Sequence, residues 1–573
     1  MRDFLAQLTF SWFLVAIECL LLFAGVVLIW RSRENPTKHN RLERWLCIFA
    51  RKKSAACVSI GVLVLVVRAT LIPVIGIPQP RWDDEYSYIL SGQTFAMGRL
   101  TNPTHPMWKY FETFHEIQRP TYSSMYPPAQ GLFLASGIIL AKNPWIGVLL
   151  ANALMCAAAC WMLQGWLPPG WALYGAFLLA MRLSILSYWM NSYFAGAVPS
   201  LGGALVLGAL PRILRKVRLI DSLLLAAGLA VLANSRPYEG MVLSIPVAVM
   251  LLFQLFRHGR SVSLSLMRVV LPLILVLGLC GAGMMYFFYR VTGNPFEMPY
   301  QANRATYAVA PYFIWQKLRP DPPIGNPQMR DYVRWERTDF AETQTLPRLA
   351  KRTLRRKLPN IWAFYLGPIL SVPLLWGGLA FRDRRMRLPL WIAAAVIAGS
   401  IVETWTFAHY LAPAASLLFL LLVQCIRHMH LCSWRGFPLG RQLVRAIPAL
   451  CLALFAVRVV AAAGHLPIEP PWPRGNLERS AIIGELKSIP GDHLVIVNDS
   501  PHWTGNDWIF NGPDIDHEKI VWARDMGEGA DHELLNYFHD RQVWWLDPDH
   551  KPIQLSPYRT GSGMTTRGSG TSQ

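Results

Sequence analysis

Apolar runs long enough to cross a bilayer recur along this chain, and short basic segments separate them. About 20 residues of α-helix span the hydrocarbon core of a membrane. Runs that reach or approach this length predict about twelve transmembrane helices. They occupy residues 11–30, 55–77, 145–166, 171–190, 196–210, 219–233, 241–256, 269–289, 361–380, 388–403, 409–426 and 446–463. The sequence therefore predicts a polytopic α-helical membrane protein.

The overall composition supports this prediction and argues against a nucleic-acid-binding protein. Of the 573 residues, 53% are hydrophobic and 16% are charged, whereas soluble domains carry about 25% charged residues. A net charge of +20 would suggest nucleic acid in a soluble protein, but here the basic residues lie between apolar runs. Basic residues so placed report membrane topology, so we expect no nucleic-acid partner.

The basic connections alternate along the chain, which predicts the side of the membrane that each one faces. They lie within residues 31–54, 212–218, 257–268, 382–387 and 427–445. The alternate connections, which contain Arg236 as their single basic residue, lie near 167–170, 191–195, 234–240 and 404–407. Placing the basic set in the cytoplasm requires that the short apolar segment 130–141 does not cross, so we predict an interfacial or re-entrant helix there. Both termini then lie outside, in a bacterial-type inner membrane.

This topology divides the membrane part of the chain into two regions. Residues 1–54 form the first helix and a basic cytoplasmic loop, and residues 55–463 form the main transmembrane domain, with external loops at 78–127 and 290–360. The second external loop is itself basic, especially at 348–357. A basic helix at this surface would meet phosphate groups of a substrate or anchor the loop to anionic lipid headgroups, and both interpretations stay open.

Residues 464–558 differ in composition, because acidic residues there outnumber Lys and Arg. Short apolar strands and one helix predict a small α/β domain outside the membrane. These elements are expected at 494–497, 520–522 and 542–546 for the strands and at 531–538 for the helix. The Ser-, Gly- and Thr-rich tail at 559–573 is expected to be disordered.

Three consecutive carboxylates, Asp83, Asp84 and Glu85, follow the second apolar run in the first external loop. Like charges this close raise the pKa of at least one of them when they are partly desolvated. A shielded carboxylate at a membrane edge can act as a general base toward a hydroxyl group. Two alternatives stay open: the acids solvate a helix end, or they bind a divalent cation, although the run lacks a recognisable ligand spacing.

Other polar and aromatic residues are expected at the same membrane face as these acids. The candidates for binding a substrate or its phosphate are Tyr88, Lys109, Tyr126, Arg236, Arg304, His409 and Tyr410. Two arginines, Arg68 and Arg182, lie inside predicted helices, where a charge is costly and points to function. Arg68 either binds the same phosphate or acids or extends to the interface, whereas Arg182 is deeper and is expected to have a buried partner.

A family resemblance follows from the order of these residues. Asp84, Glu85 and Tyr88 after an outward-running helix, then Gly98, then Tyr126 with two prolines, resemble the GT-C superfamily of membrane glycosyltransferases. The protein O-mannosyltransferase and aminoarabinose lipid A transferase branch is the most similar, over roughly residues 58–422.

The resemblance implies transfer of a sugar from a polyprenyl-phosphate donor to a glycan, lipid or protein acceptor at the outer face. It gives Asp84 the place of the base and Glu85 that of a second acid, and it leaves the choice between Asp83 and Asp84 open. The chemistry suits the residues, because a polyprenyl phosphate leaves as a stabilised anion and needs one base and cationic partners. The alternatives are a transporter or lipid flippase, although no inverted repeat is visible, and a non-catalytic assembly partner.

Overall fold

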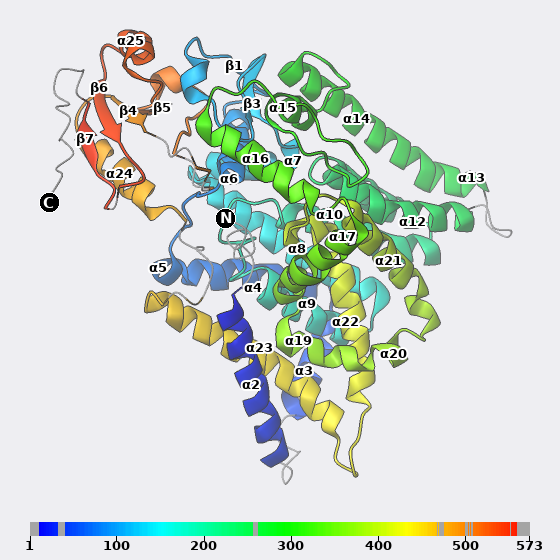
Figure 1. Ribbon diagram of the computed structural model, residues 1–573. Coiled ribbons are helices and arrows are strands. Elements are labelled where there is room, and N and C mark those ends of the chain that lie inside the picture. Colours follow the sequence, from blue (N-terminus) through cyan, green and yellow to red (C-terminus); the bar gives the residue numbers. More distant parts are fainter. Residues whose placement is uncertain are drawn as a thin grey trace.

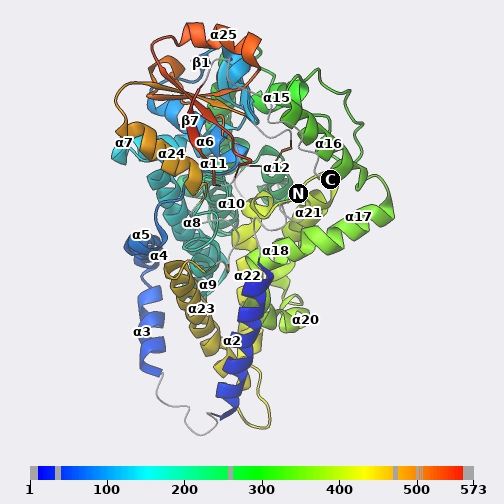
Figure 2. The same cartoon turned by 60° about the vertical axis from the view of Figure 1, so that its left-hand side comes forward.

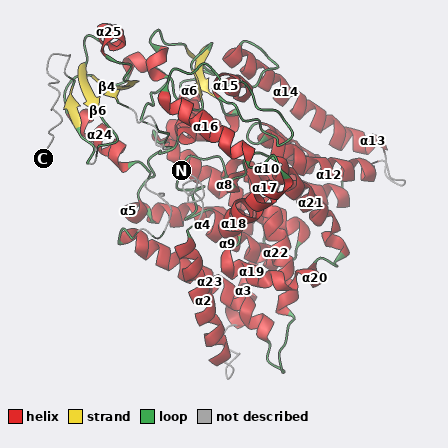
Figure 3. Ribbon diagram, viewed as in Figure 1, coloured by secondary structure: helices red, strands yellow, loops and turns green. Residues whose placement is uncertain are grey.

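The computed structural model describes residues 11–31, 40–255, 262–466, 468, 475–498, 502–503, 505, 508–550 and 552–558. Helices make up most of the molecule, and the strands gather at one end of the helical part (Figure 1, Figure 3). Figure 2 shows the C-terminal sheet at the same end in a second view. The tail at 559–573, for which disorder is predicted, lies outside the described residues.

Nine helices in the described part of the chain are long and apolar enough to cross a membrane. The spans contain α2 (Trp12–Arg31), α4 (Lys53–Thr70), α8 (Pro144–Trp166), α10 (Ala197–Arg215), α12 (Pro237–Leu255), α14 (Leu271–Thr292), α21 (Arg387–Val402), α22 (Ala415–His430) and α23 (Leu439–Ala463). A tenth span is counted if the helical segments Leu346–Tyr365 and Gly367–Ala380, which meet at 90°, act as one. The protein is thus a polytopic helical membrane protein.

This count is lower than the predicted twelve because two of the expected helices are short and the helix expected at 361–380 is broken into shorter segments. The helices α9 (Pro169–Leu183) and α11 (Leu219–Ala233) have 15 residues each, less than the roughly 20 that a span needs. The prediction of a helix at 171–190 is wrong in its second half, where turns follow Leu183. There the Ser187 hydroxyl donates to Leu183 O (2.7 Å) and the Ser192 hydroxyl to Tyr188 O (2.6 Å), bonds that favour local turns over a regular helix.

The short apolar segment near 130–141 forms the helix α7 (Pro128–Ala141), which has 14 residues and is not counted among the spans. It packs between α6 (Asp83–Ala96) and α8. The approach to α8 is close, because a Cβ added at Gly147 would lie 1.9 Å from Phe133 O. Its length agrees with a helix that does not cross, while the side of the membrane that it faces stays a prediction.

The remaining helices are shorter and several lie outside the predicted spans. They are α3 (Asn40–Ala50), α5 (Ile72–Ile75), α13 (Val262–Ser265), α15 (Pro299–Tyr307), α16 (Pro327–Ala341), α17 (Leu346–Arg352), α18 (Leu358–Tyr365), α19 (Gly367–Ser371), α20 (Gly377–Ala380), α24 (Leu477–Ser488) and α25 (Glu528–Tyr537).

Two small sheets lie at the strand-bearing end. In the first external loop, β1 (Asn102–Pro103), β2 (Glu116–Ile117) and β3 (Thr121–Ser124) are antiparallel in the order β1-β3-β2. The C-terminal sheet has the order β5-β4-β6-β7, in which the first three strands are parallel and the last is an antiparallel edge. Its strands are β4 (His493–Val497), β5 (Ile520–Arg524), β6 (Gln542–Leu546) and β7 (Leu555–Pro557).

The C-terminal sheet buries both of its faces, which explains its continuous apolar strands. On one face Leu494 and Val521 pack with Tyr110 and Tyr122 of the first external loop. The Tyr110 hydroxyl donates to Ala530 O (2.6 Å), and the Tyr122 hydroxyl donates to Asn511 O (2.8 Å). The small C-terminal domain therefore packs directly against residues 78–127, the segment that contains Asp83, Asp84 and Glu85.

Of the two arginines inside predicted helices, Arg68 is buried and Arg182 is partly buried. Arg182 donates to Glu18 Oε1 at 2.6 Å, so it has the buried partner that was expected of it. Arg68 donates to Asn191 Oδ1 (3.1 Å) and Gly76 O (2.7 Å), and its guanidinium lies 4.6 Å from the centre of the Trp145 ring. Arg68 therefore joins helix ends to one another and does not extend to the interface.

The predicted topology can be tested at Lys142, which is exposed at the end of α7. In a variant whose exposed Cys19 and Cys47 are replaced by Ser, we expect Lys142→Cys to react with a membrane-impermeant maleimide in intact cells. Arg384→Cys, in a basic connection, is the control and is expected to react only after permeabilisation. The reverse pattern would overturn the topology.

The Arg182 and Glu18 pair predicts a coupled effect on stability. Arg182→Met leaves the carboxylate of Glu18 buried without its cation, which is expected to lower the free energy of unfolding by about 3 kcal/mol. Adding Glu18→Gln removes that charge and is expected to restore part of the loss. Thermal unfolding in detergent measures both variants, and equal stability of the single and double variants would contradict the coupling.

Candidate active site

The acidic residues form the first turn of α6, and they point in different directions. Glu85 is buried and accepts hydrogen bonds from the backbone N–H groups of Arg81 (3.0 Å), Trp82 (3.2 Å) and Tyr193 (3.0 Å). Burial raises the pKa of Glu85 to about 7, although these donors oppose the rise. Glu85 therefore caps the helix and joins it to the turn after α9, and it does not line the cavity that is described below.

Asp83 and Asp84 lie together with His115, which comes from the first external loop. His115 Nδ1 is 3.6 Å from Asp83 Oδ1 and 3.5 Å from Asp84 Oδ1, and the Tyr126 hydroxyl donates to Asp84 Oδ1. One ligand atom from each of the two aspartates and from His115 lies within 4.8 Å of the others. The arrangement is a compact set of two carboxylates and one imidazole.

The backbone of His115 is held in an unusual conformation at this point. Its φ is +59°, in the left-handed region that residues other than glycine seldom adopt. The Ser87 hydroxyl (2.7 Å) and the Met125 N–H (3.1 Å) both donate to His115 O. Strain of this kind persists where the surroundings fix it and gathers at functional sites.

The carboxyl group of Asp83 is the more buried member of the pair. Burial raises its pKa to about 6, while the charge of His115 opposes the rise and that of Asp84 adds to it. A carboxyl group with a pKa near 6 changes its charge close to neutral pH, which is typical of groups in active sites.

A mainly aromatic cavity opens beside the two aspartates. It collects side chains from loops at the strand-bearing end and from the ends of several helices. Its lining residues are Trp82, Asp83, Asp84, His115, Met125, Tyr126, Tyr188, Phe194, Arg236, Tyr300, Arg304, Tyr332, Trp335, Trp405, Phe407, His409, Tyr410 and Trp503.

Two arginines line this cavity, and each is paired with a glutamate that offsets part of its charge. Arg236 Nη1 lies 3.6 Å from Glu239 Oε1, and its guanidinium lies 4.2 Å from the centre of the Tyr410 ring. Arg304 is buried and donates to Glu336 Oε1 at 2.8 Å. Both guanidinium groups are therefore largely desolvated, a setting in which contacts with an anion are strong.

Seven residues that the sequence singled out line this one cavity. They are Asp83, Asp84, Tyr126, Arg236, Arg304, His409 and Tyr410. Four others do not line it. Tyr88 stacks on Tyr126, with ring centres 4.2 Å apart, but it is not part of the lining. Glu85 caps α6, and Arg68 joins helix ends. Lys109 is exposed on the 3-10 helix Trp108–Phe111.

The cavity also contains aromatic residues that the sequence did not indicate. Tyr332 and Trp335 lie on one face of α16, three residues apart, and Trp405 follows α21. Trp503 comes from the C-terminal domain and contacts α16. Its backbone N–H donates to Asp331 Oδ2 (3.2 Å), and its ring centre is 4.8 Å from that of Tyr332. The i, i+3 spacing of Tyr332 and Trp335 was the one available sequence signal.

Comparisons with known proteins identify similar structures but no related sequence. No family model matches the chain, and no curated protein matches it either. The oligosaccharyltransferase of Archaeoglobus fulgidus in complex with Zn and sulfate is 12% identical, with a TM-score of 0.47 over 85% of this chain and 67% of that one. ArnT from Cupriavidus metallidurans bound to undecaprenyl phosphate is 12% identical, with a TM-score of 0.49 over 85% of this chain and 93% of that one.

A further structure of the archaeal enzyme AglB, in complex with an inhibitory peptide and a dolichol-phosphate, is 12% identical. Its TM-score is 0.45, over 86% of this chain and 69% of that one. These proteins are GT-C glycosyltransferases, the class that the sequence motifs resemble. At TM-scores below 0.5 the likenesses assign no reaction to this chain.

Proposed function

We propose that this protein transfers a glycosyl group from a polyprenyl-phosphate donor to an acceptor hydroxyl, with Asp84 as the general base. The observation that carries the proposal is the composition of one cavity. It holds two adjacent carboxylates, two imidazoles and two largely desolvated guanidinium groups within aromatic walls. A base for the acceptor and cations for the leaving phosphate are the two requirements of this reaction.

Exposure supports Asp84 over Asp83 as the base. The side chain of Asp84 is 31% exposed, whereas that of Asp83 is 4% exposed. A general base must come within hydrogen-bond reach of the hydroxyl from which it takes the proton. In this proposal Asp84 takes that proton, the acceptor oxygen bonds to the anomeric carbon, and the bond from that carbon to the phosphate oxygen breaks.

The arginines are assigned to the phosphate group of the donor. Arg236 and Arg304 would stabilise the negative charge that the polyprenyl phosphate gains as it leaves. His409, whose Nδ1 lies 3.0 Å from the Tyr188 hydroxyl, and Tyr410 lie beside Arg236 and would orient the same group. The polar groups of the cavity come from the start of α6, the first external loop, α15 and the segments that follow α11 and α21, which favours this reading over a transporter with a midplane site.

Asp83, Asp84 and His115 also suit a divalent cation. His115 Nδ1 is buried and has no hydrogen-bond partner among the described residues, and it faces two carboxylates. Carboxylate oxygens together with imidazole nitrogen are common ligands of divalent metals. Bound there, a cation would supply positive charge beside the donor phosphate.

The side of the membrane and the partners complete the proposal. We assign the cavity and residues 464–558 to the outer face of a bacterial-type inner membrane, following the distribution of basic connections. Nucleotide sugars are made inside the cell, so a donor used outside has to be carried by a lipid. The acceptor is then a glycan, a lipid or a protein that presents a hydroxyl group at that face.

Asp84→Asn tests the base. Loss of a general base typically lowers a rate by about 10² to 10⁴-fold, so we expect at least a hundredfold loss of sugar transfer with an unchanged melting temperature. The assay incubates the full-length protein with undecaprenyl-phosphate sugars labelled in the sugar and with isolated membranes as acceptor. Asp549→Asn, at an exposed site, is the matched control, and full activity of Asp84→Asn would exclude this role.

The raised pKa of Asp83 predicts a pH dependence. Below its pKa of about 6 the group is protonated and loses its charge, so transfer is expected to fall as the pH is lowered through 6. For this group the folded state holds the proton more tightly than the unfolded chain does. Its contribution to stability therefore declines as pH rises from about 4 to 6, opposite to activity. Rates and melting temperatures measured from pH 4.5 to 8 separate the two, and a flat rate profile would contradict the prediction.

A further inference from the structure

A second site lies on the surface formed by α16, α17 and the π-helical turn η3 (Thr353–Lys357). Here a depression of about 540 Å³ is lined by five cationic side chains and by Glu342 as its one acid. The cations are Arg348, Lys351, Arg352, Arg355 and Arg356. We call it the basic depression.

The inner cations of the basic depression are already paired. Arg352 donates to Asp339 Oδ2 at 2.6 Å, and Arg356 donates to Glu342 Oε2 at 2.8 Å. The outer three, Arg348, Lys351 and Arg355, are exposed, and no ion pair of theirs occurs among the described residues. They present about three uncompensated positive charges on one side of the helix, at spacings of three and four residues.

The exposed surface of this helix carries leucines as well as cations. The segment Leu346–Tyr365 meets the following segment Gly367–Ala380 at 90°, so the two do not form one straight span. Leu346, Leu354 and Leu358 are 79%, 65% and 48% exposed. Exposed leucines beside exposed cations are the pattern of a helix that rests in the interface of an anionic membrane.

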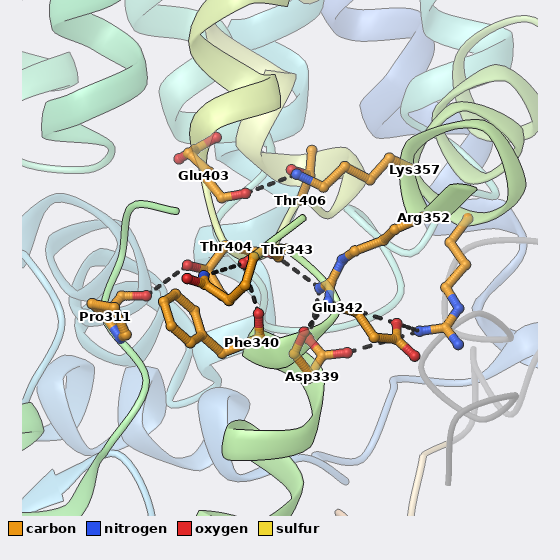
Figure 4. Close-up of polar contacts among 12 residues, drawn as sticks. Pro311, Asp339, Phe340, Glu342, Thr343, Arg352, Lys357, Glu403, Thr404 and Thr406 are labelled. Atoms are coloured by element: carbon orange, nitrogen blue, oxygen red, sulfur yellow. Dashed lines mark hydrogen bonds and ion pairs between the residues drawn. The ribbon is translucent and has the colours of Figure 1, made fainter. Parts of the chain in front are cut away.

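The helix is also bonded to the loop that follows α21 (Figure 4). Arg352 donates to Thr404 O (2.9 Å), and Lys357 donates to Glu403 O (2.8 Å). The Thr404 hydroxyl in turn donates to Pro311 O (2.7 Å). Residues 403 and 404 precede Trp405, which lines the cavity, so the basic depression is a preformed surface held by the same loop.

We propose that the basic depression binds the phosphodiester headgroup of an anionic bilayer lipid. Arg348, Lys351 and Arg355 contact the phosphate, and the exposed leucines lie beside the acyl chains. The inference is independent of the proposed reaction, whose phosphate would bind at Arg236 and Arg304 inside the cavity. Phosphatidylglycerol is the probe that matches this chemistry, because it carries one phosphodiester and no positive charge.

Native mass spectrometry of the full-length protein in detergent tests the proposal. With added phosphatidylglycerol, we expect the triple variant R348Q/K351Q/R355Q to bind its tightest lipid at least roughly tenfold more weakly than the wild type. The control R382Q/R384Q/R387Q removes the same charge from another exposed basic segment and is expected to bind as the wild type does. Phosphatidylcholine is expected to bind equally weakly to all three.

Other results would overturn the assignment. Wild-type affinity of the triple variant for phosphatidylglycerol would do so, as would equal affinity of the wild type for phosphatidylcholine. If undecaprenyl phosphate alone loses affinity in the triple variant, the depression belongs to the sugar carrier and the lipid assignment is wrong. If the triple variant fails to fold, the single variants R348Q, K351Q and R355Q decide, each with an expected loss of about twofold to fivefold.

Discussion

The arrangement of the site depends on two adjacent carboxylates at the start of α6, of which Asp83 is buried and Asp84 is partly exposed. Taking a carboxylate out of water costs several kcal/mol unless charges and donors compensate. The rise of the Asp83 pKa from 3.8 to about 6 corresponds to about 3 kcal/mol of that cost. His115, the Tyr126 hydroxyl and the positive N-terminal end of α6 offset the remaining cost of desolvating the two carboxylates. The neighbourhood of Asp83 and Asp84 is therefore constrained before any substrate enters.

The C-terminal domain is part of this constraint. One face of its sheet packs on Tyr110 and Tyr122, in the same loop that supplies His115. The domain also places Trp503 in the cavity wall, against Tyr332. A segment far from the acidic residues in sequence thus closes the cavity and stabilises the loop that holds the imidazole.

The sequence predicted what depends on local pattern and charge. Apolar length predicted most of the helices, and continuous apolar runs predicted three strands of the terminal domain. The expectation from the basic connections that 130–141 does not cross stays a prediction. The sequence did not predict the surroundings of side chains whose positions depend on tertiary contacts. Arg68 lies inside a predicted helix and Arg236 lies beside one. Asn191 and Trp145 surround Arg68, whereas Arg236 lines the cavity. Nothing in the local sequence of Trp503 indicates that it meets Asp331.

The loop after α21 connects the two surfaces that bear cations. On one side Trp405 lines the cavity, and on the other the carbonyl groups of Glu403 and Thr404 accept from Lys357 and Arg352. These donors neutralise carbonyls at the end of a helix, where a cation is favourable. Removing either cation would therefore loosen the cavity wall without touching a residue that lines it. A lipid bound at Arg348, Lys351 and Arg355, as proposed, would restrain the same helix whose Arg352 and Lys357 hold the cavity wall.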